Sequence, residues 1–190
     1  EATVQSAVED DVLAVNPSSA IRLGKRAERK ARALAPDEMH RLLATAEVKE
    51  AEALDAEADD TERKLTTRTR PLVAALWCVL AYTGLRPSEA LALKWDDIDT
   101  EQRVLHVKRT LVRLGGKAAA WSLDAPKTEK SARTVSMVEP VLDALARHRT
   151  RQFRRMQRVA RYGFEHHGFV FATHDGDPLR EDVVYKSHFR

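Results

Sequence analysis

The sequence predicts an α+β fold that is mainly helical and contains a small three-stranded antiparallel sheet. Three observations lead to this prediction. Apolar residues recur at helical spacing in the first half of the chain and again in its last third, whereas between them, over residues 104–138, they alternate as in strands. No apolar run approaches the roughly 18 residues of a membrane span. Hydrophobic residues form 43% of the 190-residue chain, which is enough to bury a sizeable core.

The first part of the chain contains a helix end, a basic linker and the start of a second helix. Residues 1–16 carry valines at helical spacing, and Asn16-Pro17 then breaks the pattern. Residues 18–35 are rich in arginine and lysine and are predicted to be a linker. A new helix is expected near Pro36, because proline favours the first helical turn and the acids that follow it favour the positive helix end. The acidic, alanine-rich stretch 48–69 is compatible with either a helical extension or a surface insertion.

Two further helices are expected before the sheet. The segment that begins at Pro71 is strongly apolar and ends at Gly84, a residue typical of the end of a helix. Arg86 to Glu89 then begins the next helix, with a proline in its first turn.

The central strands are predicted from alternation and from turn residues. A first strand begins at Val104, Gly115-Gly116 forms a turn, and residues 118–123 return as a second strand. Residues 133–138 form the third strand, after a polar loop.

The last part of the chain is helical again. Pro140 begins a long helix that reaches about Arg161. A short apolar segment, 169–171, and a turn at 175–178 precede the start of a final helix. The side chains of the long helix that are expected to face inward are Leu142, Leu145, Phe153, Met156 and Val159.

The net charge of +3 is unevenly distributed along the chain. Residues 37–62 contain ten acids and two bases, whereas residues 103–165 contain fifteen bases and five acids. A basic block of this strength is expected where a protein contacts phosphates. The same composition also occurs on a solvated helix face, so composition alone leaves both interpretations open.

One motif carries a strong resemblance to a known family. The segment YTGLRPSEALALKWDDID, residues 82–99, closely resembles the first catalytic box of the tyrosine recombinases, the phage integrase family. The resemblance implies that Arg86 is the first catalytic arginine, which holds the scissile phosphate. Arg86 stands where a helix is expected to begin, a position suited to binding an anion. Glu89, three residues later, is expected to cap that helix start and support the site.

A second motif follows at the distance and in the order that the family shows. The segment PKTEKSARTV, residues 126–135, is similar to the family's lysine-bearing turn. The resemblance implies that Lys127 donates a proton to the leaving 5′ oxygen, and a crowded cationic site can lower the pKa of such an amine. Lys130 and Arg133 are expected to contact DNA phosphates or to have a structural role.

The resemblance implies a fold, a reaction and partners. It implies site-specific DNA recombination or integration by phosphoryl transfer through a 3′-phosphotyrosine intermediate, without a metal or any other cofactor. The partner is double-stranded DNA, on which the full-length protein would form a homo-tetramer in the bacterial cytoplasm, associated with the nucleoid during recombination. Residues 1–17 would end a DNA-clamping core-binding domain, 18–35 would be the linker, and 36–190 an incomplete catalytic domain.

The family also uses a His-x-x-Arg pair, a further His or Trp and a tyrosine nucleophile, which the resemblance places after Pro178. The sequence shows no such set there, so we expect a fragment that lacks the nucleophile and is inactive alone. The run His148-Arg149-Thr150-Arg151, followed by Tyr185, imitates the spacing. It comes before the segment 169–171 rather than after it, and we therefore reject it as the catalytic box.

Two alternatives of other classes stay open. The chain could be a decayed recombinase that acts only as a DNA-binding module, or a helical interaction domain with no nucleic-acid role. A metal site at His166-His167 or His174-Asp175 is not expected, because the sequence offers no second cluster of ligands. The single cysteine, Cys78, excludes an internal disulfide and fits a reducing cytoplasm.

Overall fold

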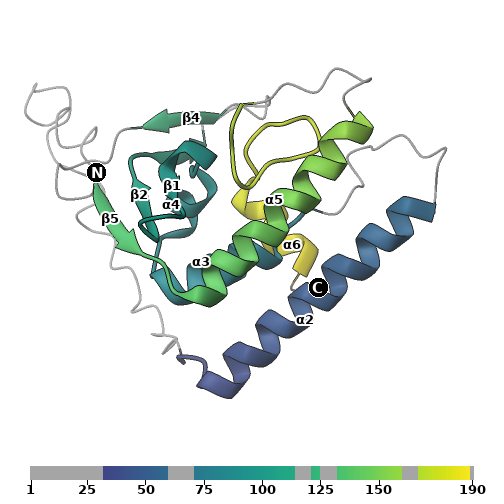
Figure 1. Ribbon diagram of the computed structural model, residues 1–190, viewed down its shortest axis with the longest axis horizontal. Helices are drawn as coiled ribbons and strands as arrows, with labels where there is room; N and C mark the ends of the chain where they lie inside the picture. The colour runs from purple at the N-terminus through teal and green to yellow at the C-terminus, as the bar shows by residue number, and fades with distance from the viewer. Residues whose placement is uncertain (1–31, 60–70, 114–120, 125–131, 160–166, 189–190) are drawn as a thin grey trace, which may run out of the picture. The chain divides into compact units, whose positions relative to one another are not determined.

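A computed structural model describes residues 32–59, 71–113, 121–124, 132–159 and 167–188 (Figure 1). The chain divides into two units after Leu34, and the elements below belong to the second. Within the described residues, none of the helices combines the length and the apolar character needed to cross a membrane. The fold class agrees with the prediction, since the described elements are mainly helices together with small antiparallel sheets.

Helix α2 (Pro36–Asp59) begins where the sequence predicted. The Glu38 carboxylate accepts the backbone N–H of Ala35 at 2.9 Å, which satisfies one of the free donors at the helix start. The helix continues through the first half of the acidic stretch, so the helical alternative holds as far as Asp59. Residues 60–70 lie outside the described part of the chain.

Helix α3 (Ala74–Thr83) is the apolar centre of the fold, and both α2 and α5 pack against it. The helix is apolar on all sides because neighbouring helices cover it on more than one side. The helix begins at Ala74, three residues after Pro71, and ends at Gly84, whose φ of 64° is the left-handed conformation expected of a C-terminal cap. The short helix α4 (Pro87–Leu91) follows and buries Ala90 and Leu91.

The strands are arranged differently from the prediction, although a three-stranded antiparallel sheet is present. It contains β1 (Ile98–Asp99), β2 (Val104–Val107) and β5 (Arg133–Ser136), with β2 in the centre. A separate two-stranded sheet contains β3 (Thr110–Arg113) and β4 (Trp121–Asp124).

The expected single first strand is therefore wrong, because Lys108 and Arg109 divide it into β2 and β3. The side chains of both residues form ion pairs with Asp97, which is 1% exposed and belongs to the 3₁₀ helix η2 (Trp95–Asp97). Because both side chains are directed at this buried carboxylate, the alternation of inward and outward side chains stops at Lys108 and Arg109. The predicted return strand then pairs with β3, and β5 pairs with β2. The Gly115-Gly116 turn lies outside the described residues.

Helix α5 (Glu139–Val159) lies along α3 and completes the core (Figure 1). Leu145 is buried as predicted, but Phe153 is 58% exposed, so its inward assignment is wrong. The reason is its place around the helix: Val141, Leu145 and His148 are buried on one face of α5, and Phe153 lies off that face. The prediction for Val159 concerns a side chain outside the described set.

The segment 169–171 is buried, and backbone bonds hold it beside the end of α4: Val170 donates to Leu93, and Trp95 donates to Gly168. Helix α6 (Glu181–His188) closes the described chain and contacts α4.

Candidate functional site

The turn between α3 and α4 presents Arg86 to solvent. Gly84 reverses the chain, Leu85 is 5% exposed and anchors the turn in the core, and Pro87 fixes the first turn of α4. Arg86 is the last residue before α4, with an extended backbone at φ −68° and ψ 147°. Its side chain is 75% exposed. A rigid backbone therefore carries an open guanidinium.

Glu89 lies directly beneath Arg86 and is 3% exposed. One carboxylate oxygen accepts the backbone N–H of Arg86 at 2.9 Å, and the other lies 3.3 Å from Nη1 of the same residue. Arg133, from the first position of β5, approaches from the sheet and donates through both terminal nitrogens, at 3.1 and 2.9 Å. Glu89 thus joins the start of α4 to the sheet.

The electrostatics of the cluster favour its ionised form. The hydrogen bond from Arg133 holds the pKa of Glu89 below its usual value of 4.5, against the effect of burial, and the Arg86 backbone bond acts in the same direction. The same hydrogen bond raises the pKa of Arg133. A buried carboxylate held by a two-pronged guanidinium is a strong, directional pair. One acid therefore faces two cations, and the cluster carries a net positive charge.

Among the predicted site residues, Arg86, Glu89 and Arg133 are brought together by the structure. Lys127 and Lys130 lie in the segment 125–131, outside the described residues.

The rejected box around His148 is a piece of the core. His148 is 1% exposed, and its Nε2 lies 2.7 Å from the carbonyl oxygen of Val170. Its ring packs between Trp95 and Phe171, with ring centres 6.1 and 5.2 Å away. Tyr185 packs against Trp77 with ring centres 6.4 Å apart. These two residues of the apparent box therefore have packing roles.

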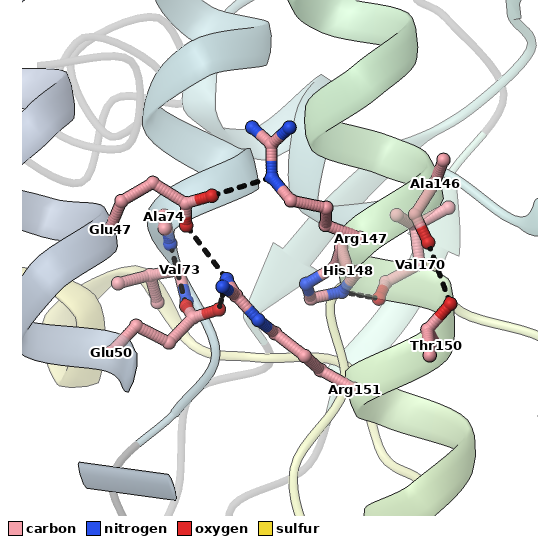
Figure 2. A network of polar contacts seen from close by, with 10 residues as sticks. All are labelled: Glu47, Glu50, Val73, Ala74, Ala146, Arg147, His148, Thr150, Arg151 and Val170. Carbon is pink, nitrogen blue, oxygen red and sulfur yellow. Dashed lines mark hydrogen bonds and ion pairs between the residues drawn. The ribbon is translucent and has the colours of Figure 1, made fainter. Parts of the chain in front are cut away.

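Sequence reasoning missed a second polar cluster, between α2, α3 and α5 (Figure 2). Glu50 of α2 is 6% exposed and accepts the backbone N–H groups of Val73 and Ala74, at 2.7 and 2.8 Å, with one oxygen. Its other oxygen accepts Arg151 of α5 at 2.8 Å. Glu50 therefore caps the start of α3, which lacks a capping side chain of its own.

Glu47 extends the same cluster along α2 and α5. It accepts Arg147 at 2.8 Å and Arg151 at 2.7 Å. Burial alone raises the pKa of Glu47, but the hydrogen bonds from these two arginines outweigh it and lower the pKa below 4.5. The available sequence signal was the spacing: two acids three residues apart on one helix, and two arginines four apart on another, each on one helical face.

Metal and thiol chemistry find little support in the described residues. No group of three or more His, Cys, Asp and Glu side chains there is placed to hold a metal ion. Cys78 is buried in α3, and burial raises the pKa of its thiol to about 11, which leaves it protonated and unreactive near neutral pH.

Comparison with known proteins places this geometry in a family. The model of the phage integrase family matches residues 32–189, which include both α4 and the β5 arginine. The chain belongs to the phage integrase family. Because this match covers most of the chain, the resemblance of residues 82–99 and 126–135 is confirmed at the level of the family.

The similar curated proteins are integrases and recombinases. Prophage integrase IntR of Escherichia coli (strain K12) is 39% identical over 70 residues, and the putative defective protein IntQ of the same strain is 38% identical over 71. Each match covers 37% of this chain and 16% of the relative. A XerC-like tyrosine recombinase of Caldanaerobacter subterraneus subsp. tengcongensis is 30% identical over 122 residues, 60% of this chain and 31% of the relative. The chain thus matches less than a third of these relatives' lengths.

The fold has a solved counterpart. The integrase of transposon Tn1549, in complex with a circular intermediate DNA, superposes with a TM-score of 0.63 at 22% identity, over 96% of this chain and 51% of that one. This likeness supports the fold of the integrase family.

Proposed function

We propose that this chain supplies part of the catalytic domain of a tyrosine recombinase, which performs site-specific DNA recombination or integration through a 3′-phosphotyrosine intermediate. The observation that supports this proposal most is the exposed guanidinium of Arg86 in a chain of the phage integrase family. The buried Glu89 holds the backbone of Arg86 in place at the start of α4. In this role Arg86 binds the non-bridging oxygens of the scissile phosphate and stabilises the charge that develops on them in the transition state. The reaction needs no metal or other cofactor.

The proposal gives Lys127 the role of general acid toward the leaving 5′ oxygen. Lys130 is proposed to contact the DNA backbone. The sequence order supports both assignments, since the segment 125–131 leads directly into Arg133, which lies beside Arg86 on Glu89. The nucleophilic tyrosine is proposed to come from sequence other than Tyr82 and Tyr185, since both pack against the core or its aromatic residues.

The partners follow from the reaction. We propose that double-stranded DNA is the substrate and that the full-length protein acts as a homo-tetramer on it, in the cytoplasm and in association with the nucleoid. The integrase of transposon Tn1549 was solved in complex with DNA, which supports DNA as the partner class. We also propose that residues 1–17 end a core-binding domain, that 18–35 link it to the catalytic unit, and that this unit occupies 36–190.

Binding of duplex DNA tests the role of Arg86. The affinity of residues 1–190 for a fluorescently labelled duplex would be measured by anisotropy at several salt concentrations. Arg86→Ala is expected to weaken binding by about tenfold and to lower the slope of log affinity against log salt by about one. Arg41→Ala is the matched control, because Arg41 is also an exposed arginine paired with an acid on its own helix, Asp37, but lies on α2. An equal loss in both variants would contradict the proposal.

Strand cleavage tests Lys127 in a full-length protein that contains this stretch. Lys127→Ala is expected to slow cleavage strongly on ordinary DNA and only weakly on a duplex whose 5′ leaving group needs no proton. Equal slowing on both substrates would remove Lys127 from the role of general acid.

A decayed recombinase that only binds DNA is the second candidate. The observation in its favour is that one relative of 38% identity carries the name of a putative defective protein. The two candidates differ in covalent chemistry. We expect residues 1–190 to bind a nicked duplex without forming a covalent adduct, whereas the full-length recombinase would form one that survives denaturation. Absence of the adduct in the full-length protein would favour the DNA-binding module.

A further inference from the structure

Two arginines compete for one buried carboxylate. Glu89 is 3% exposed, so water does not solvate its negative charge. The neighbouring cations must therefore balance that charge. Arg133 and Arg86 both reach it, the first through two short contacts and the second through a single long one of 3.3 Å from its side chain. Arg133 therefore balances more of the negative charge of Glu89 than Arg86 does.

The unequal division determines what Arg86 can do. Most of the N–H donors of the Arg86 guanidinium face solvent, because the side chain is 75% exposed. A guanidinium that had to balance Glu89 alone would turn both its terminal nitrogens inward, since a buried charge without a partner is strongly unfavourable. It would then have fewer donors for an incoming phosphate.

We propose that Arg133 is a positioning residue for Arg86: by balancing Glu89, it leaves the Arg86 guanidinium open to bind a phosphate. Arg133 acts from the first position of β5, opposite Val107 of β2, so the sheet holds its fork in place. The inference rests on the proposed function, because it gives Arg133 a task in binding the phosphate that Arg86 is proposed to hold.

This role differs from a direct contact between Arg133 and DNA. Both terminal nitrogens of Arg133 are directed at Glu89, and its side chain is 35% exposed, less than half as much as that of Arg86. A direct phosphate contact would add its own share of binding energy. A positioning role acts only through Arg86 and disappears when Arg86 is absent.

A double-mutant cycle separates the two roles. The affinity of residues 1–190 for a labelled duplex of mixed sequence would be measured by anisotropy for the native protein, Arg86→Ala, Arg133→Gln and the double variant. We expect Arg133→Gln to weaken binding several-fold in the native background and to have almost no effect on top of Arg86→Ala. The salt slope should fall by about one in each single variant and by the same amount, not twice as much, in the double variant.

Arg133→Lys gives a second test that does not depend on loss of charge. Lysine keeps the positive charge but cannot form the two-pronged contact with a carboxylate. We expect its affinity to fall close to that of Arg133→Gln, whereas a plain phosphate contact would tolerate lysine. The matched control is Arg103→Gln. Arg103 forms an exposed ion pair with Glu139 at 2.8 Å, so this substitution removes the same charge at another place on the surface. Thermal melting by circular dichroism confirms that each variant is folded at the temperature of the assay.

The possible results separate the positioning role of Arg133 from the proposed phosphate-binding role of Arg86. A loss with Arg133→Gln that persists in full without Arg86, or native affinity in Arg133→Gln itself, overturns the positioning role and leaves the proposed function intact. Native affinity in Arg86→Ala removes the proposed role of Arg86 and, with it, this inference.

Discussion

Glu50 and Glu89 are two buried carboxylates with the same local chemistry and opposite surroundings. Glu50 accepts two backbone N–H groups at the start of a helix and Glu89 accepts one, and each is bound by an arginine from another element. Around Glu50, the arginine is itself largely covered, with Arg151 22% exposed between two acids. Around Glu89 a second arginine, Arg86, remains 75% exposed.

The difference shows how to separate a structural cluster from a functional one. In the α2–α3–α5 cluster, Glu47 and Glu50 face Arg147 and Arg151, so positive and negative charges are balanced within it (Figure 2). In the Glu89 cluster one acid faces two arginines, and a cation is left toward solvent. We therefore expect variants of the first cluster to affect stability, and those of the second to affect DNA binding.

The largest effect on stability is expected from Glu50→Ala. The variant removes the two N–H acceptors at the start of α3 and one partner of Arg151, and breaking a buried ion pair in this way costs about 3 kcal/mol. Urea unfolding followed by circular dichroism would measure it. Glu52→Ala, an exposed acid of the same helix, should lie within about 0.5 kcal/mol of the native value. A loss below about 1 kcal/mol for Glu50→Ala would mean that the cap at the start of α3 contributes little to the free energy of unfolding.

A smaller difference is expected between the two arginines. Arg151→Ala should lower the free energy of unfolding by about 2 kcal/mol, because the buried Glu50 carboxylate loses its charged partner. Arg86→Ala should cost less than about 0.5 kcal/mol, because an exposed ion pair contributes little and Glu89 keeps Arg133. Unfolding of both variants under the same conditions measures the contrast. Equal costs would contradict the division into a closed cluster, formed by Glu47, Glu50 and their arginines, and an open cluster around Glu89.

The pH dependence of stability should come from His148, next to the closed cluster. Burial lowers its pKa below the ordinary 6.5, despite its bond to Val170. The unfolded chain therefore binds a proton before the folded one does, and stability is complete above pH 6.5 and falls as the pH decreases below it. The charged groups that face the ring are Glu50 from α2 and Arg151 and Arg155 from α5.

His148→Phe tests this dependence. We expect the native protein to lose about 1 kcal/mol over one pH unit below the ordinary pKa of histidine, and the variant to lose almost nothing. Phenylalanine keeps the packing between Trp95 and Phe171, and Gln152 still donates to the Val170 carbonyl at 3.0 Å. The carboxylates Glu47 and Glu89 titrate below 4.5 and act outside this range. The same slope in both proteins would place the proton elsewhere.

The sequence predicted the helices better than the sheets, for a local reason. Pro36 and Gly84 act through their own backbones, so the start of α2 and the end of α3 could be read from single residues. The division between β2 and β3 depends on the ion pairs of Lys108 and Arg109 with Asp97, which lies ten or more residues earlier. Such a contact has no local signal in the alternation of apolar residues.

The candidate site shows the same limit. The motif predicted Arg86 and Glu89 and the order in which Arg133 follows. It did not predict that Arg133, 44 residues after Glu89, shares this carboxylate with Arg86. Glu50 was missed for the same reason, since it caps a helix that begins 24 residues later. Conversely, the order of segments was enough to reject His148 as part of the catalytic box, and its burial in the core agrees with that rejection.

A small effect on stability is expected from Gly84→Ala, in the turn that leads to Arg86. No atom lies within 4 Å of the position that a Cβ would take, so the cost is the left-handed conformation at φ 64°, offset in part by the stiffer unfolded chain, and amounts to about 0.5–1 kcal/mol. The variant should remain folded in a urea titration. Because the turn carries Arg86, a strained turn should also weaken DNA binding, whereas Glu50→Ala, measured well below its melting temperature, should not. If Gly84→Ala lowers stability but leaves the affinity for duplex DNA unchanged, the turn does not set the position of Arg86, and the open cluster owes its geometry to Glu89 and Arg133 alone.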